Sequence, residues 1–144
     1  MTAQGAAQKT GRNKILSRFK DSKAFSSFSV NDLKKASDFY GGILGLGVTE
    51  TQEGLELHLA GGNTVFLYPK PNHTPASFTV LNFPVNNIEE TVAGIVDVGL
   101  RLEHYDLPDL KTDKRGIASG PGMKIAWFKD PAGNILSVIE EGKQ

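Results

Sequence analysis

Cysteine is missing from the sequence, which excludes disulfide bonds, zinc sites built on thiolates and thiol nucleophiles. No run of about 18 apolar residues occurs either, so we expect no membrane-spanning helix and no membrane partner. The first 24 residues lack the apolar block of a secretory signal, and we therefore expect a cytoplasmic location. Tryptophan occurs once, as Trp127, which provides a single fluorescent reporter.

The charges balance to zero over the 144 residues but are distributed unevenly. Residues 1–24 contain six Lys or Arg and one Asp. Because the whole chain has 16 residues of each sign, residues 25–144 contain ten basic and fifteen acidic residues, a net charge of −5. An acidic folded part argues against a nucleic-acid partner. Residues 1–22 are predicted to be a basic, flexible N-terminal extension, and residues 23–144 a single domain.

Residues 125–140 (IAWFKDPAGNILSVIE) predict a β-hairpin near the C-terminus. Pro131 fixes φ for a turn, and Gly133 and Asn134 tolerate positive φ, so the five residues DPAGN can reverse the chain. In the second strand, side chains alternate between the two faces. Leu136 and Val138 are therefore expected on one face of this strand, and Ile135, Ser137 and Ile139 on the other.

The remaining elements follow from hydrophobic periodicity. Helices are expected to begin near Asp32 and Asn87 and to end at Gly45 and Gly99. The side chain of Asp32 or Asn31 can cap the first helix, and that of Asn87 the second. Strands are predicted over 23–30, 49–53, 55–59, 64–68, 78–85 and 100–105. Residues 106–122 are predicted to form a long loop, which is either a lid over a pocket or a solvated connection.

The order strand–helix–strand–strand–strand thus occurs twice, which indicates an internal duplication. An offset of 55 residues aligns SVNDLKKA (29–36) with PVNNIEET (84–91), and an offset of 71 aligns LAGGNTVF (59–66) with DPAGNILS (130–137). The predicted organisation is module one over 23–68, a proline-rich linker over 69–77 and module two over 78–141.

Three longer segments show a family pattern: SVNDLKKASDFYGGILGLGV (29–48), FPVNNIEETVAGIVDVGLRL (83–102) and WFKDPAGNILSVIE (127–140). Together with the doubled order of elements, they resemble the vicinal oxygen chelate superfamily. That superfamily includes glyoxalase I, extradiol dioxygenases, and bleomycin and fosfomycin resistance proteins. The resemblance implies an α+β fold in which two βαβββ modules form an incomplete barrel with helices on its outer face. It also implies a homodimer, as in many relatives.

In this fold the aliphatic strand faces would pack on the helices, and the opposite faces would line a cavity. The resemblance implies ligand-binding roles for the residues on those opposite faces: Phe25, Glu56, His58, Phe66, Tyr68, Val80, Asn82, Glu103, Tyr105, Trp127 and Ser137. The aromatic members favour a pocket for a small apolar or aromatic molecule, unless the same side chains simply fill the cavity.

Enzymes of this superfamily usually hold one divalent metal through His or Glu at four strand positions. The pattern places Phe25, Phe66, Val80 and Ser137 at these positions, and none of them supplies an imidazole or a carboxylate. The residues directly before and after each position are not His, Asp or Glu either. We therefore expect no metal cofactor in this cavity.

The sequence therefore predicts a protein like the glyoxalases and bleomycin resistance proteins, which binds a small organic molecule in a cavity without the usual metal ligands. One alternative is a metal-dependent lyase, isomerase or dioxygenase with a relocated metal site built from Glu56, His58 and either Glu103 or His104. Another is a structural or interaction module with a filled cavity. The sequence leaves open whether the chain is an enzyme, and it indicates no catalytic residue, since neither a Ser-His-Asp triad nor a phosphate-binding glycine motif can be argued.

Overall fold

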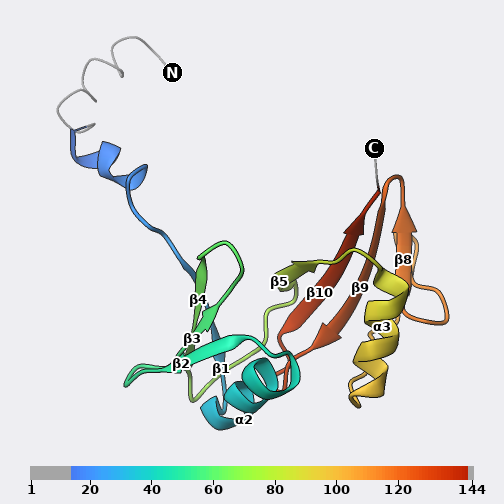
Figure 1. The fold of residues 1–144 in the computed structure, drawn as a ribbon, viewed down its shortest axis with the longest axis horizontal. Coiled ribbons are helices and arrows are strands. Elements are labelled where there is room, and N and C mark those ends of the chain that lie inside the picture. The colour runs from blue at the N-terminus through green and yellow to red at the C-terminus, as the bar shows by residue number, and fades with distance from the viewer. Residues whose placement is uncertain (1–13, 143–144) are drawn as a thin grey trace.

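The structure, a computed structural model, describes residues 14–142 and contains two copies of one βαβββ unit (Figure 1). The first copy comprises β1 (Ser26–Val30), α2 (Leu33–Ser37), η2 (Asp38–Ile43), β2 (Gly47–Glu50), β3 (Leu55–His58) and β4 (Thr64–Pro69). The second comprises β5 (Thr79–Pro84), α3 (Ile88–Asp97), β8 (Ile117–Gly120), β9 (Met123–Lys129) and β10 (Ile135–Glu141). A separate two-stranded hairpin, β6 (Asp106–Leu107) and β7 (Leu110–Lys111), is inserted between α3 and β8. The predicted α+β duplication is confirmed.

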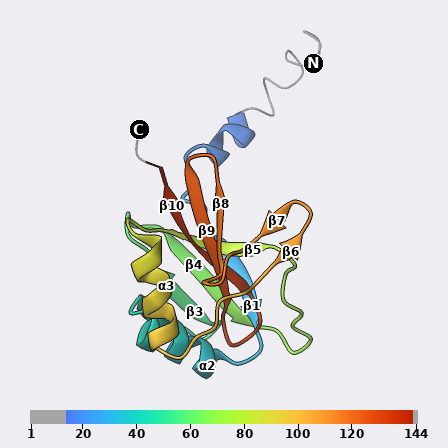
Figure 2. The same cartoon turned by 90° about the vertical axis from the view of Figure 1, so that its right-hand side faces the viewer.

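Part of the predicted N-terminal extension, residues 1–13, lies outside the described residues. Residues 14–22 are exposed and include one short 3-10 turn, η1 (Ser17–Phe19). They project away from both sheets (Figures 1 and 2). No described helix is long and apolar enough to span a membrane.

The two sheets have the same topology, β1-β4-β3-β2 and β5-β10-β9-β8, and are not closed into a barrel. In each sheet the first and last strands of the module run parallel to each other. Their registers place Ser27 opposite Phe66 in the first sheet and Asn82 opposite Ser137 in the second. The step from Ser27 to Asn82 is 55 residues and that from Phe66 to Ser137 is 71, so the sheet register reproduces both offsets found in the sequence.

Both helices begin at the predicted caps. Asp32 Oδ1 accepts a hydrogen bond from the backbone N–H of Lys35, and Asn87 Oδ1 accepts one from that of Glu90, each at 3.0 Å. The first helix is less regular than predicted, because α2 widens after one turn into the π-helix η2. The wide turn carries Phe39 and Tyr40, and both side chains are buried.

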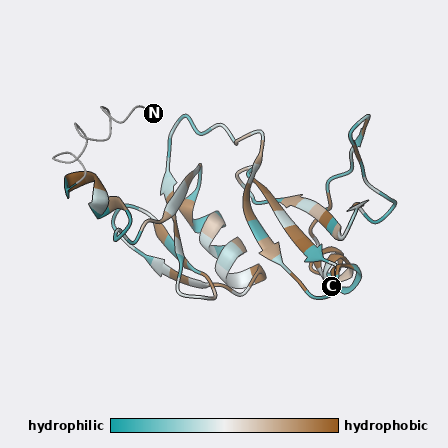
Figure 3. Cartoon of the chain, turned by 90° about the horizontal axis from the view of Figure 1, so that it is seen from above, coloured by the Kyte–Doolittle hydropathy of each residue, from teal (hydrophilic) through white to brown (hydrophobic). Residues whose placement is uncertain are grey.

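The aliphatic strand faces pack on the helices as predicted. Hydrophobic residues alternate with polar ones along the strands (Figure 3), and the members of one face are buried in a single core. Fully buried examples on the strands are Val30, Leu57, Leu67 and Leu136. The opposite strand faces, which we call the open face, therefore point away from this core.

The predicted strand over 100–105 is wrong. The second strand of the second module is β8, which lies within the segment predicted to be a loop over 106–122 and pairs with the first half of β9. Leu102 instead forms an isolated bridge with Phe128, and Glu103 donates its backbone N–H to Trp127 O at 2.7 Å. Two separate segments thus share one edge of β9. The alternation of apolar and polar residues over 100–105 places Leu102 in the core, but the segment forms only one bridge and no full strand.

The DPAGN turn connects the two modules through the buried carboxylate of Asp130. Asp130 Oδ1 accepts hydrogen bonds from the backbone N–H groups of Ala132 and Asn134, at 2.9 and 2.8 Å. Asp130 Oδ2 accepts from Asn134 Nδ2 at 3.0 Å and from the hydroxyl of Tyr40, in η2 of module one, at 2.7 Å. Asn134 Nδ2 also donates to Ser29 O on β1, so one turn of module two holds two elements of module one.

The linker is fastened to the same junction by His73. Its Nε2 lies 2.9 Å from Ala132 O, and its Nδ1 lies 2.6 Å from the hydroxyl of Ser29. A carbonyl oxygen can only accept, so we assign the hydrogen to Nε2 and the acceptor role to Nδ1. The imidazole therefore bridges β1 and the β9–β10 turn.

The buried phenol of Tyr40 predicts a loss of stability at alkaline pH. Burial raises the pKa of Tyr40 well above its ordinary value of 10.0, and the neighbouring Asp130 charge raises it further. Above about pH 10 the unfolded chain loses this proton while the folded chain keeps it, so the stability present below that pH falls as pH rises. We expect Tyr40→Phe to remove up to about 1.4 kcal/mol of that loss per pH unit.

Urea denaturation between pH 9 and 11 checks this expectation. The matched control is Tyr68→Phe, because Tyr68 is an exposed residue of β4. Tyr68→Phe should retain the alkaline loss of the unmodified protein. Equal pH slopes for Tyr40→Phe and the unmodified protein would contradict the assigned role of Tyr40.

Candidate functional site

Three adjoining pockets lie along the open face of the first module and its border with the second. One, of about 350 Å³, is lined by Phe25, Glu56 and Phe66 together with Thr51, Glu53 and Thr64. The second, of about 390 Å³, lies between the residues around β1 and β5, the edge strands of the two sheets, and includes Phe25 and Val80. The third, of about 370 Å³, includes Ser27, Tyr68, Phe78 and Val80. Shared lining residues make the three pockets one continuous surface.

The predicted site residues of the second module form a separate cluster. The Trp127 indole N–H donates to the hydroxyl of Thr79 at 3.1 Å. The Tyr105 ring meets the Trp127 ring edge to face, with 5.4 Å between centroids. Partial burial raises the pKa of Tyr105, and the nearby Glu103 charge raises it further. Neither aromatic side chain lines the three pockets described above.

Ser137 and Asn82 form a hydrogen-bonded pair in the second sheet, with the Ser137 hydroxyl donating to Asn82 Oδ1. Ser137 is fully buried, whereas Asn82 is exposed. The amide of Asn82 is therefore the part of this pair that reaches the surface of the open face.

Two of the polar residues proposed as alternative metal ligands, His58 and Glu103, each contact a different protein side chain. His58 Nε2 lies 2.7 Å from the hydroxyl of Thr49, and His58 is exposed at the end of β3. Glu103 forms an ion pair with Lys129 at 3.4 Å. Within residues 14–142, no group of three or more His, Asp or Glu side chains is arranged to hold a metal ion.

The donor chemistry of the four family positions does not fit a divalent metal. Phe25, Phe66 and Val80 have no donor atom in their side chains. Ser137 has a hydroxyl, but that hydroxyl is buried and already donates to Asn82. Hard divalent cations prefer carboxylate oxygen, borderline ones such as Zn²⁺ also take imidazole, and this set offers neither ligand.

Residues 25–138 match the family model of the Glyoxalase/Bleomycin resistance protein/Dioxygenase superfamily. The chain belongs to this superfamily. The resemblance inferred from the sequence is confirmed, and so is the fold that it implies. No curated protein gives a significant match.

Solved structures of superfamily proteins share this architecture. An antibiotic-binding protein from a Streptomyces species is 22% identical, with a TM-score of 0.60, over 83% of this chain and 96% of that one. A glyoxalase family protein from Enterococcus faecalis is 22% identical, with a TM-score of 0.60, over 81% and 94%. A superfamily protein from Alicyclobacillus acidocaldarius is 15% identical, with a TM-score of 0.61, over 83% and 91%. At these identities the similarity establishes the fold and not the ligand.

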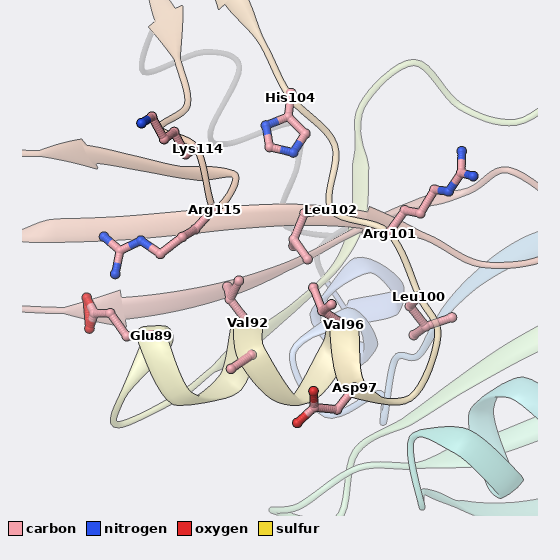
Figure 4. A pocket seen from close by; sticks show the side chains of 11 residues that line it. Glu89, Val92, Val96, Asp97, Leu100, Arg101, Leu102, His104, Lys114 and Arg115 are labelled. Atoms are coloured by element: carbon pink, nitrogen blue, oxygen red, sulfur yellow. The ribbon is translucent and has the colours of Figure 1, made fainter.

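One further pocket of this superfamily member was not anticipated from the sequence. It measures about 620 Å³ and lies between α3 and the segments around Leu102 and Lys114, on the side of the second sheet that α3 covers (Figure 4). The available sequence signal was the apolar stripe of α3, which continues from Val92 to Val96 and on to Leu100 beyond the helix end.

Proposed function

We propose that this superfamily member binds a small, partly aromatic organic molecule on its open face without using a metal ion. The observation that carries the proposal is the chemistry of the four family metal positions, which hold Phe25, Phe66, Val80 and Ser137. Replacing ligands by phenyl and isopropyl groups favours contact with an apolar molecule. Sequestration of that molecule requires no catalytic group.

The lining of the pocket around Phe66 suggests the kind of molecule. Phe25 and Phe66 provide aromatic walls, and Glu53 and Glu56 provide two carboxylates in the same pocket. An aromatic ligand with an amino group would satisfy both features, since its rings can pack on the phenyl groups while its cation meets a carboxylate. The antibiotic-binding protein of similar fold is consistent with this kind of role.

Binding on the open face can be measured through Trp127. We expect at least one compound in a panel of small aromatic amines to change Trp127 emission at micromolar concentration, because the indole N–H donates to Thr79, which lines one of the three adjoining pockets. Phe66→Ala should weaken that binding about fivefold or more through the lost ring contact. Phe19→Ala is the matched control, since Phe19 is 75% exposed on η1, and it should leave affinity unchanged.

Metal analysis of the purified protein provides the second arm. We expect no stoichiometric divalent metal, and addition of divalent metal ions should not alter binding of the same amine. A bound metal lost on Glu56→Gln or His58→Ala would instead support the metal-dependent lyase, isomerase or dioxygenase. No emission change with any compound would favour a cavity filled by its own side chains. The homodimer and the cytoplasmic location stay predictions, and analytical ultracentrifugation checks the first.

A further inference from the structure

The 620 Å³ pocket, which we call the outer groove, lies on the opposite side of the second sheet from the open face. Its apolar lining comes from Val92 and Val96 on α3 and from Leu100 and Leu102 after the helix (Figure 4). Val92 and Leu102 are buried members of the core, so this part of the lining is packed against the hydrophobic core. Val96 is 55% exposed at the mouth, where an apolar side chain faces water in the absence of a partner.

Basic side chains surround this apolar surface. Lys114, Arg115 and His104 lie across the groove from α3, and Arg101 lies at one end (Figure 4). Arg115 pairs with Asp113 at 3.0 Å, in an exposed ion pair. No ion pair among residues 14–142 involves Lys114 or Arg101.

Within the described part of the chain, the two carboxylates that line the groove form no ion pair with Lys114 or Arg101. Glu89 accepts a hydrogen bond from Lys124 at 3.0 Å, which lowers the pKa of Glu89, and the Arg115 charge lowers it further. Asp97 points away from the apolar lining, toward the far side of α3 (Figure 4). The groove thus combines an apolar floor with an excess of positive charge at its rim.

The segment that carries Lys114 is held in place against the floor. Asp113 Oδ1 accepts hydrogen bonds from the backbone N–H groups of Arg115 and Ile117, at 2.8 and 2.9 Å. Gly116 has a φ of 90°, and a Cβ at this position would lie 2.8 Å from Leu102 Cβ. This close approach sets the basic turn directly beside the buried leucine of the floor.

We infer that the outer groove binds a small amphipathic anion, with its apolar body on Val92, Val96 and Leu102 and its anionic head toward Lys114. The volume of about 620 Å³ lies within the usual range of small-molecule sites, and a mostly apolar lining with a few charged groups is their usual makeup. The uncompensated cation at the rim selects for negative charge on the ligand. This inference is independent of the function proposed for the open face.

A titration with 8-anilinonaphthalene-1-sulfonate, an aromatic sulfonate that fluoresces in apolar sites, tests this inference. We expect saturable binding that Val96→Glu weakens about tenfold or more. The matched control is Val98→Glu, because Val98 is 56% exposed, two residues away, and does not line the groove. Val98→Glu should change the affinity less than twofold. Equal effects of the two substitutions, or no saturable binding, would overturn the inference.

Charge selectivity is tested separately. Lys114→Glu should weaken binding about fivefold or more, whereas Lys111→Glu, on β7 outside the groove, should have little effect. Decanoate should displace the probe, and decylammonium, with the same chain and the opposite charge, should not. Equal displacement by both would overturn the anionic assignment. Phe66→Ala should leave probe binding unchanged, so failure of the open-face proposal and failure of this one give different results.

Discussion

Asp130→Ala is expected to destabilise the folded protein by about 3–5 kcal/mol, a loss comparable to breaking a buried charged network. The carboxylate is 5% exposed and accepts four hydrogen bonds. Its removal leaves the Tyr40 hydroxyl and the Asn134 backbone N–H without their acceptor, and both residues are almost completely buried, whereas the Asn134 side chain keeps Ser29 O. Each unsatisfied buried donor costs about 1–3 kcal/mol. Urea denaturation followed by Trp127 emission measures the loss.

Two further substitutions separate the carboxylate from the side-chain volume. Asp130→Asn keeps the shape but turns one acceptor oxygen into a donor that faces existing donors, so we expect a smaller loss of about 2 kcal/mol. Asp113→Ala is the matched control, because Asp113 also accepts two backbone N–H groups in a turn but is exposed. It should cost about 1 kcal/mol. If Asp130→Ala costs no more than this control, the turn does not hold the two modules together.

Gly54→Ala is expected to destabilise the protein by about 3 kcal/mol or more through a backbone clash. A Cβ at Gly54 would lie 2.0 Å from Leu67 O and 3.1 Å from Leu67 C. Leu67 belongs to β4 and is paired with Leu55 of β3, so its carbonyl cannot move without disturbing that ladder. Gly54 is itself held by hydrogen bonds of its N–H and C=O to Thr51. Relieving the clash therefore requires breaking hydrogen bonds at Gly54 or between β3 and β4.

Gly94→Ala provides a control of opposite sign. Gly94 lies within α3, and apart from its chain neighbours and the backbone of the helix itself no atom comes within 4 Å of a Cβ built there. Alanine at this site should stabilise the protein by about 0.5–1 kcal/mol, because glycine is the weaker helix former. Urea midpoints and soluble yields of the two variants should move in opposite directions. A loss of stability below about 1 kcal/mol for Gly54→Ala would show that the β4 backbone at Leu67 can move to accommodate the added Cβ.

Several features of the fold depend on short stretches of sequence and were predictable for that reason. The caps at Asp32 and Asn87 act on backbone groups three residues away. Side chains alternate between the two faces of a strand, so the buried face can be predicted from every second residue. The duplication is visible because similar short segments occur in both modules. Predictions based on these signals correspond to the observed caps, buried strand faces and sheet registers.

The predicted strand over 100–105 failed for a non-local reason. Its alternation is compatible with a strand, but β9 offers only one free edge, and β8 occupies most of it. Which segment pairs with β9 depends on the path of residues 104–116, which include the small β6–β7 hairpin. The local sequence pattern does not indicate whether residues 100–105 or β8 will pair with β9. For the same reason the sequence did not predict the outer groove.

The sequence by itself determined the duplicated modules, the aliphatic and polar faces of the strands, and the absence of the usual metal donors at four family positions, because each depends on residue type and local period. Only the tertiary structure decided what those residues touch. Tyr40 meets Asp130 across 90 positions, and Val96 shares a groove with Lys114, because packing of distant segments sets both contacts. Local period predicts which way a side chain faces, and packing decides what it meets there.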